Sequence, residues 1–163
     1  MSTQTKPKVL LACDPGYDRL GIAVLSGSVH DHTLLYSACA TTNKKDSHEK
    51  RLSFLQSELE KLIEEYKPNA IALETLFFAR NTTSALKVAE ARGMILALAG
   101  RLDIPVLEHS PQEVKMAVTG YGNAKKEEVI AMTKRLIPGI SPKALDDEYD
   151  AVALSICAIA SLR

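Results

Sequence analysis

Two acidic residues stand at the ends of short apolar runs, where a carboxylate is costly. In the stretch VLLACDPGYDRLGIAVL, residues 9–25, Asp14 closes a strand-like run and precedes a Pro-Gly turn. Glu74 closes the run AIALE, residues 70–74, in the same way. Taking an ionised carboxylate out of water costs several kcal/mol unless a partner offsets the loss. An Asp before Pro-Gly also initiates turns readily, so this stretch alone leaves a purely structural interpretation of Asp14 open.

Two further acidic residues belong to the last helix-like segment, DDEYDAVALSICAIASLR, residues 146–163. Asp147 and Asp150 are three residues apart, so a helix places both on one face. Acidic residues in a first helical turn also favour the helix dipole and cap free N–H groups, which would account for Asp146, Asp147 and Glu148 without any chemistry. Asp150 lies beyond the capping positions and directly precedes the apolar run AVAL, so we expect it to face packed structure.

Together these carboxylates indicate a site for divalent metal ions. If the strands that end at Asp14 and Glu74 are neighbours, both side chains lie at one edge of the sheet, where ligands bind in α/β proteins. Their mutual repulsion favours a cation between them. Mg²⁺ prefers oxygen ligands, and two ions about 3.5–4 Å apart can activate a water and stabilise the leaving oxygen of a phosphodiester. The sequence therefore predicts a metal site at this edge, of a kind that could act on a phosphodiester.

The elements that must position these acids follow from the apolar pattern. Short apolar runs predict strands, and apolar residues at helical spacing predict helices. The expected strands are 8–14, 21–26, 33–42, 70–74 and 104–109, and the expected helices lie within 47–68, 81–100, 111–118, 125–137 and 146–163. Short connections between the first three strands are typical of an antiparallel meander, and AIALE is as apolar as a strand covered on both faces. The predicted fold class is α/β, with a mixed five-stranded sheet of an antiparallel meander plus parallel strands, flanked by helices.

The length and composition of the chain limit its domain organisation and the kinds of site it can contain. The 163 residues predict a single domain over 1–163, with the polar residues 1–7 as a disordered N-terminal extension. Twenty basic and twenty acidic side chains cancel, so binding to nucleic acid would need a local basic face or metal ions. Cys13, Cys39 and Cys157 lack the CxxC spacing of a zinc ribbon and do not suggest a disulfide framework. With no signal-peptide core and no run of membrane-spanning length, we expect a cytoplasmic protein that contacts no membrane.

Four blocks of the sequence resemble a known family in the same order. They are ACDPGYDRLGIAV (12–24), AIALETLFFARNTTSALKVAEARGMI (70–95), VKMAVTGYGNAKKEEV (114–129) and DDEYDAVALSICA (146–158). These blocks are similar to the RuvC family of Holliday-junction resolvases, within the ribonuclease-H-like superfamily, and the resemblance spans nearly the whole chain. The second block is the most specific, because a strand-ending Glu is followed by aromatics, Asn, SALK and ARG.

The resemblance implies an activity and its partners. It makes Asp14, Glu74, Asp147 and Asp150 the metal-binding catalytic set for two Mg²⁺ ions, with Mn²⁺ able to substitute. The implied reaction is the resolution of four-way DNA junctions by symmetric nicks in two strands of like polarity, in recombination and repair. Paired nicks imply a homodimer, in the family through the helix that would be 84–98 here, where Ala85, Ala89, Ala91, Gly93 and Ala97 would permit close approach. A branch-migration motor complex is a further implied partner.

DNA-binding side chains are also implied. Phe77 and Phe78 follow Glu74 in an expected loop, where exposed aromatics can stack on or wedge between bases, although most Phe residues are core. The resemblance points to Phe77 as the junction contact, and to Lys115 and Lys126 as contacts to the DNA backbone. Arg80 and Lys125 could complete this local basic face, and such phosphate contacts make binding weaken with salt.

The chain departs from the family pattern at two places. Residues 17–20, Tyr-Asp-Arg-Leu, stand where relatives carry small or basic residues and a Thr, and Asp18 adds a negative charge near the proposed metals. Relatives often have a basic C-terminal tail, whereas the last helix here ends at Arg163. Both differences predict weaker binding of DNA.

Other functions remain open from the sequence. A nuclease of the same fold could act on RNA or on RNA–DNA hybrids. An Asp-x-Gly turn between strands also cradles phosphates in actin-like nucleotide-binding proteins, although these need a second domain and a second phosphate loop. A noncatalytic junction-binding module is disfavoured because all four acids are present.

Overall fold

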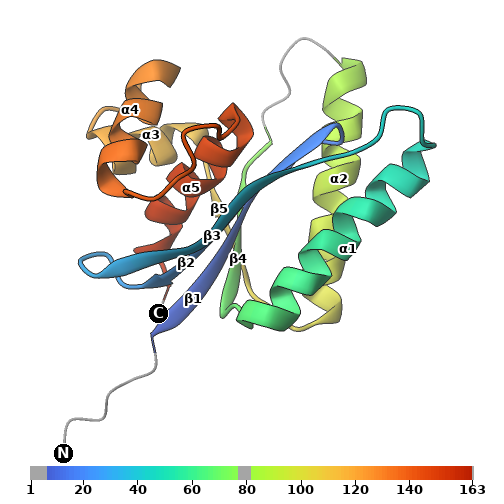
Figure 1. The fold of residues 1–163 in the computed structure, drawn as a ribbon, viewed down its shortest axis with the longest axis horizontal. Coiled ribbons are helices and arrows are strands. Elements are labelled where there is room, and N and C mark those ends of the chain that lie inside the picture. Colours follow the sequence, from blue (N-terminus) through green and yellow to red (C-terminus); the bar gives the residue numbers. More distant parts are fainter. Residues whose placement is uncertain (1–6, 77–81, 163) are drawn as a thin grey trace, which may run out of the picture.

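The computed structural model describes residues 7–76 and 82–162, and it shows one five-stranded sheet between two layers of helices (Figure 1). The strand order across the sheet is β3-β2-β1-β4-β5. The strands are β1 Lys8–Asp14, β2 Arg19–Gly27, β3 His32–Thr41, β4 Ala70–Glu74 and β5 Val106–His109. The helices are α1 His48–Tyr66, α2 Thr82–Arg101, α3 Pro111–Thr119, α4 Lys126–Leu136 and α5 Asp146–Ile159.

The sheet is mixed, as the sequence predicted. β1 pairs antiparallel with β2, and β2 pairs antiparallel with β3, so the first three strands form a meander. β4 joins β1 in parallel, and β5 joins β4 in parallel. The element order βββαβαβααα is confirmed, and the main difference is that β2 begins at Arg19, two residues earlier than expected.

Each central strand contributes side chains to two cores, because successive side chains point to opposite faces. Leu10 and Ala12 of β1 pack in the core that contains α5. Leu11 and Cys13 pack on the other face, in the core that contains α1 and α2. Both faces of the sheet are therefore covered, which explains the nearly continuous apolar runs of β1 and β4.

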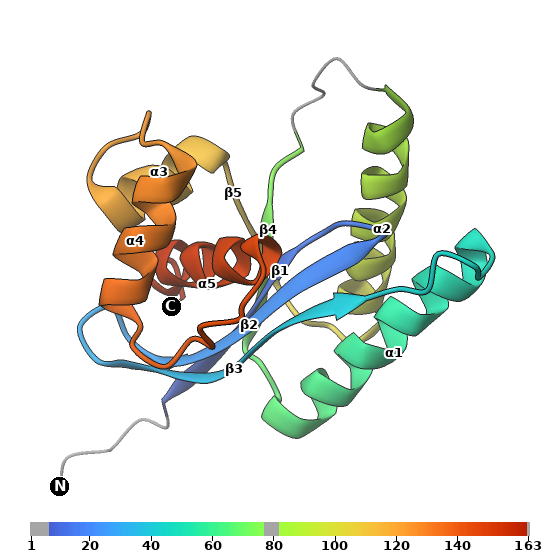
Figure 2. The same ribbon diagram turned by 45° about the horizontal axis from the view of Figure 1, so that its top comes forward.

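The two helical layers differ in how deeply they are buried. α5 lies directly on the sheet, with α3 and α4 outside it (Figure 2), and most of its residues are buried. α1 and α2 cover the opposite face and keep an exposed outer side. Ala91 of α2, which we expected to favour contact with a second subunit, is 0% exposed and packs inside this chain's own fold.

Some predictions fall outside the described residues. These are most of the expected N-terminal extension (1–6) and three expected DNA contacts, Phe77, Phe78 and Arg80. Among the helices that the structure describes, none combines the length and the apolar character that crossing a bilayer requires.

Candidate active site

Asp14 and Glu74 lie on neighbouring strands and point to the same face of the sheet. β1 and β4 are paired in parallel, with Cys13 opposite Leu73, so the next residue on each strand is one of the two acids. Since side chains alternate along a strand, Asp14 continues the row of Leu10 and Ala12, on the face covered by α5. Glu74 continues the corresponding row of β4. The prediction that the two strands are neighbours is confirmed.

The first turns of α5 bring two more acids to this edge, and a glycine makes room for them. Gly21 of β2 is the pairing partner of Asp14. A Cβ added at Gly21 would overlap the backbone carbonyl oxygen of Asp147. The missing side chain therefore allows the start of α5 to lie against β2, beside Asp14, and Asp150 follows one helical turn later.

The four carboxylates interact electrostatically. Burial raises the pKa of Asp14 to about 7, and the nearby charges of Asp150, Asp147 and Glu74 contribute to that rise. The pKa of Glu74 is also raised, first by burial and then by Asp150. Burial raises the pKa of Asp150 as well, although Lys126 opposes the shift. Like charges held together in a partly buried place disfavour ionisation, so a cation at this edge would stabilise the charged forms.

Two basic side chains of the protein partly balance these acids. Lys126 Nζ lies 3.2 Å from Asp150 Oδ2 and 3.4 Å from Asp146 Oδ2. Arg19 Nε lies 2.9 Å from Asp147 Oδ2. That Asp147 oxygen is buried, yet it receives no well-aligned hydrogen bond from any described residue.

A cavity of about 260 Å³ opens at this edge, and both acidic and basic side chains line it. Its lining residues are Asp14, Glu74, Pro111, Val114, Lys115, Lys126, Val129, Asp150 and Ala153. An adjoining cavity of about 250 Å³ also has Asp14 and Glu74 in its wall, together with Val88 of α2. Larger clefts exist elsewhere on the described surface, but neither Asp14 nor Glu74 lines them.

The donor set suits a divalent metal ion, although the ligands are not gathered around one point. Carboxylate oxygens are what Mg²⁺ and Mn²⁺ prefer, and the buried Asp147 oxygen has only the ion pair with Arg19 and no well-aligned hydrogen bond from the described residues. Within 7–76 and 82–162, however, no three His, Cys, Asp or Glu side chains lie close enough together to hold one ion. Binding would therefore require side-chain rotation, with Asp147 turning from Arg19 and Asp150 from Lys126.

The outer supports of this edge were not identified from the sequence. Arg92 of α2 forms an ion pair with Glu108 of β5, and its Nε donates to the Glu74 carbonyl oxygen at 3.4 Å. This contact joins α2 to the end of β4. Arg92 lies in the ARG motif of the second sequence block, which was the available signal.

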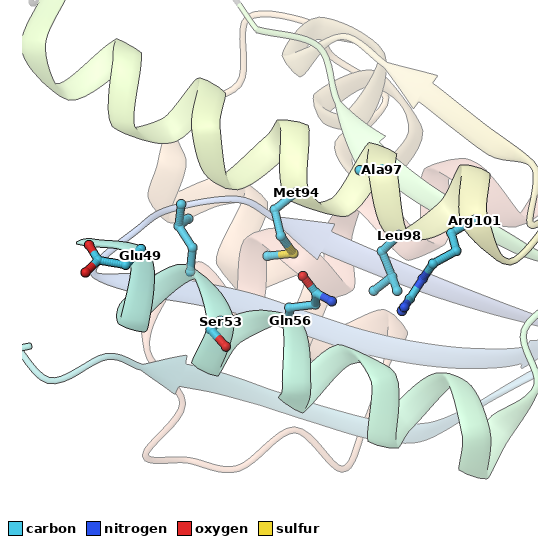
Figure 3. A pocket seen from close by; sticks show the side chains of 8 residues that line it. Glu49, Ser53, Gln56, Met94, Ala97, Leu98 and Arg101 are labelled. Atoms are coloured by element: carbon cyan, nitrogen blue, oxygen red, sulfur yellow. The ribbon is translucent and has the colours of Figure 1, made fainter. Parts of the chain in front are cut away.

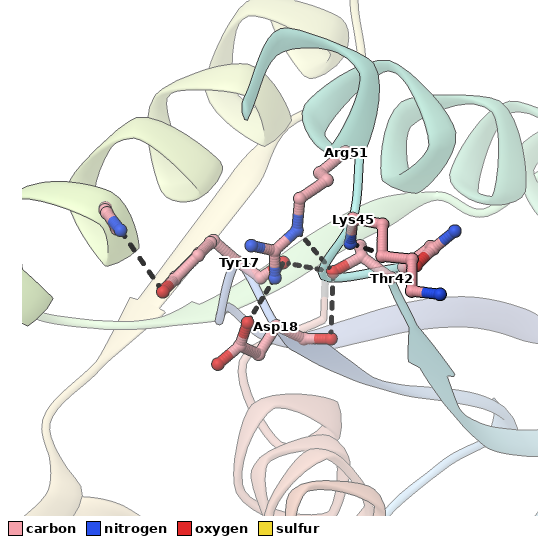
Figure 4. Close-up of polar contacts among 7 residues, drawn as sticks. Tyr17, Asp18, Thr42, Lys45 and Arg51 are labelled. Atoms are coloured by element: carbon pink, nitrogen blue, oxygen red, sulfur yellow. Dashed lines mark hydrogen bonds and ion pairs between the residues drawn. The ribbon is translucent and has the colours of Figure 1, made fainter. Parts of the chain in front are cut away.

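The charge of Asp18, which we expected to disturb the site, is paired elsewhere. Its carboxylate forms an ion pair with the buried Arg51 of α1 (Figure 4). Of the lysines expected to contact DNA, Lys115 lines the cavity that contains Asp14 and Glu74, and Lys126 forms an ion pair with Asp150. Lys125 is exposed just before α4, away from the cavity lining.

Comparison with known proteins gives one consistent result. The family model described as "Crossover junction endodeoxyribonuclease RuvC" matches residues 10–158. The curated RuvC proteins of Rickettsia felis and Rickettsia bellii are 42% and 41% identical to this chain, over 90% of its length and 94% of theirs. The solved structure of T. thermophilus RuvC in complex with Holliday junction substrate is 28% identical, with a TM-score of 0.86 over 94% of both chains. A second Thermus thermophilus RuvC structure is 27% identical, with a TM-score of 0.81 over 94% of this chain and 95% of that one. The chain belongs to the RuvC family of crossover junction endodeoxyribonucleases.

Proposed function

We propose that this protein is a metal-dependent endonuclease that resolves four-way DNA junctions by paired symmetric nicks, in recombination and repair. The observation that carries the proposal is the meeting of acids from β1, β4 and α5 beside two lysines, in a chain of the RuvC family. The T. thermophilus relative was solved with a Holliday junction, which supports the same class of substrate here.

In this proposal Asp14, Glu74, Asp147 and Asp150 hold two Mg²⁺ ions, and Mn²⁺ can take their place. When bound, such ions lower the pKa of an attacking water and stabilise the 3′ leaving oxygen. The protein's own part is to hold the carboxylates at one edge of a rigid sheet. Lys115 and Lys126, in the wall of the same cavity, bind the phosphate that is cut and its neighbours.

Further DNA contacts are proposed around this edge. Lys125 extends the basic face at the start of α4, where it is exposed. Phe77, Phe78 and Arg80, between β4 and α2, are proposed to contact the junction, with Phe77 as the aromatic that meets its bases. Contacts of this kind position the junction and are independent of the acids.

We propose a homodimer through the helix 84–98, so that two sites cut two strands. The outer face of α2 supports this contact, because Leu86 is 61% exposed and a Cβ at Gly93 would meet no atom within 4 Å. Beside it, a largely apolar cleft of about 460 Å³ runs between α1 and α2 (Figure 3). Leu52, Met94 and Ala97 line that cleft. A second copy that packs on this face would bury these apolar side chains.

The cellular location of the enzyme and one partner complex are proposed from the family. We place the enzyme in the cytoplasm, where it would act on recombining DNA together with a branch-migration motor complex. Neither the location nor the motor complex is needed for the proposed chemistry of Asp14, Glu74, Asp147 and Asp150.

The test is cleavage of a labelled four-way junction, with and without Mg²⁺, mapped to the nucleotide. A linear duplex and an RNA–DNA hybrid of the same sequence serve as matched substrates. The proposal predicts Mg²⁺-dependent nicks at symmetric positions on the junction and little cutting of the other two. Equal rates on the linear duplex, or preferred cutting of the hybrid, would contradict it, and binding without cutting would indicate a noncatalytic module.

A further inference from the structure

The turn after Asp14 is held by a cluster of charged and aromatic side chains outside the acidic edge. Arg51 of α1 is its centre, and only 8% of this residue is exposed. Its Nε donates to Thr42 Oγ1 at 2.9 Å, and its Nη2 donates to the Tyr17 carbonyl oxygen at 3.3 Å and pairs with the Asp18 carboxylate (Figure 4). Thr42, just after β3, also donates its backbone N–H to the Asp18 carbonyl oxygen at 2.9 Å. The turn is therefore attached to β3 and α1 by several hydrogen bonds.

Tyr17 extends this cluster to α2. Its ring lies near two cations, with Arg51 Cζ at 4.3 Å and Lys87 Nζ at 4.5 Å from the ring centre. Lys87 Nζ also donates to the Tyr17 hydroxyl at 3.3 Å, and His48 meets the ring edge-on at 5.9 Å between centres. An aromatic ring attracts cations to its faces, so Tyr17 joins α1 and α2 to the turn.

Lys87 belongs to the second turn of α2, which begins directly after the segment with the proposed aromatic contacts. Tyr17 lies three residues after Asp14. Tyr17 thus connects the turn that follows Asp14 to the start of α2. Val88, the neighbour of Lys87, lines the cavity that contains Asp14 and Glu74.

We propose that Tyr17 is a positioning residue for junction cleavage. Its ring contacts Arg51 and Lys87 and thereby fixes the turn after Asp14 relative to the start of α2. The role rests on the proposed nuclease function. Tyr17 touches neither the acids nor the scissile phosphate in this account, and it acts through the backbone that follows Asp14. A small displacement of a reacting group lowers a rate steeply, whereas DNA binding through the lysines does not depend on it.

The experiment measures the single-turnover rate constant of junction cleavage at saturating protein, the junction dissociation constant and the melting temperature. Tyr17→Leu removes the aromatic ring, and Tyr17→Phe keeps it without the hydroxyl. Lys87→Met removes only the cation on α2. Lys134→Met is the matched control, because Lys134 Nζ lies 5.0 Å from the ring centre of Tyr149, outside this cluster.

We expect Tyr17→Leu and Lys87→Met to lower the saturating rate at least about tenfold. Their dissociation constants should stay within about twofold, since the phosphate-binding lysines are unchanged. Tyr17→Phe should stay within about threefold of the parent, because the face of a Phe ring also attracts cations. Lys134→Met should behave as the parent.

A purely stabilising role gives a different result. It would lower the melting temperature of Tyr17→Leu and leave the saturating rate of the folded protein at the parental value, which would overturn the proposal. If Tyr17→Leu does not fold, the saturating cleavage rate and the melting temperature of Lys87→Met distinguish the two roles in the same way.

Amide hydrogen exchange separates this proposal from the proposed function. Exchange in residues 14–18 should accelerate in Lys87→Met and not in Lys134→Met, whether or not the parent cuts DNA. A parent that cuts no junction refutes the nuclease function alone. Unchanged exchange in Lys87→Met refutes the link between α2 and the turn.

Discussion

Asp14 and Asp18 lie four residues apart on the same turn, yet their surroundings are opposite. Asp18 forms an ion pair with Arg51. Tyr17 accepts a hydrogen bond from Thr42, which follows β3, and another from Lys87 of α2, and Thr42 accepts one from Arg51 of α1. Asp14 is surrounded by Asp150, Asp147 and Glu74, and its pKa is raised to about 7. We call the first region, residues 17, 18, 42, 51 and 87, the Tyr17 cluster, and the second, residues 14, 74, 147 and 150, the acidic edge.

The difference separates groups that stabilise the fold from the acids for which we propose a role in cleavage. Opposite charges that meet in a partly buried place satisfy each other, whereas acids that gather without enough cations reduce the stability of the folded state. A chain that keeps such acids together gains something other than stability.

Removing an acid at the edge should abolish cleavage without weakening the fold. We expect Asp150→Asn and Glu74→Gln to lower the rate of junction cleavage roughly 10³-fold, equivalent to about 4 kcal/mol, because each removes a proposed metal ligand. Junction binding in a gel-shift assay should persist, because the lysines remain.

Asp146→Asn is the matched control for these variants. Asp146 lies in the same helical turn of α5, but its side chain is 63% exposed and it does not line the cavity. We expect its cleavage rate to stay within about threefold of the parent, as for most changes at exposed positions. A loss in Asp146→Asn as large as in Asp150→Asn would contradict the assignment of the site.

Removing the centre of the Tyr17 cluster should have its main effect on stability. Arg51→Met leaves Asp18 and Thr42 without their partner, and we expect the free energy of unfolding to fall by about 2–3 kcal/mol. Asp18 is 42% exposed at its side chain, so Asp18→Asn should cost less, about 0.5–1 kcal/mol. Urea unfolding of both single variants and the double variant measures their coupling. If the losses of the two single variants add up in the double variant, the ion pair contributes nothing to the free energy of unfolding.

The acidic edge should make the metal-free protein less stable as the pH rises. The folded-state pKa of Asp14, about 7, lies above its ordinary value of 3.8. The stability linked to its protonation is therefore complete below the ordinary value and is lost as the pH rises through about 7. In EDTA at pH above that range, we expect Asp14→Asn to be more stable than the parent by up to about 4 kcal/mol, since the pKa shift from 3.8 to about 7 is roughly three units and each unit corresponds to about 1.4 kcal/mol. The extra stability of Asp14→Asn should shrink toward pH 4. A stability difference that stays constant across this pH range would contradict the raised pKa of Asp14.

Lys126 should contribute to DNA binding more than an ordinary surface lysine. We expect Lys126→Met to weaken junction binding about tenfold and to reduce the slope of log affinity against log salt by about one. Lys61→Met removes the same charge from the outer side of α1, where the side chain is 71% exposed, and should change affinity less than twofold. Equal effects of the two variants would show that only net charge matters.

The sequence predicted the parts of the site that depend on local pattern. The alternation in β1 and β4 determines the face on which Asp14 and Glu74 lie, and the spacing of Asp147 and Asp150 determines a helix face. The bounds of β1 and β4 were predicted correctly, whereas the ends of β2, β3 and β5 differ by one or two residues.

The remaining contacts join residues far apart in the chain, which local pattern does not encode. Arg51 reaches back 33 residues to Asp18, and Lys87 reaches back 70 residues to Tyr17. For Gly21, the reason for a glycine is the backbone of Asp147, which only the folded structure brings near. Asp18 was misjudged for the same reason, because its charge was visible in the sequence and its partner was not.

An anomalous diffraction map from crystals of the protein soaked in Mn²⁺ tests whether the four acids bind metal. We expect anomalous density bonded to carboxylate oxygens of Asp14 and of at least two of Glu74, Asp147 and Asp150, and none at the same place in Asp14→Asn. Density absent from this edge in the parent, or bound equally well in Asp14→Asn, would contradict this expectation.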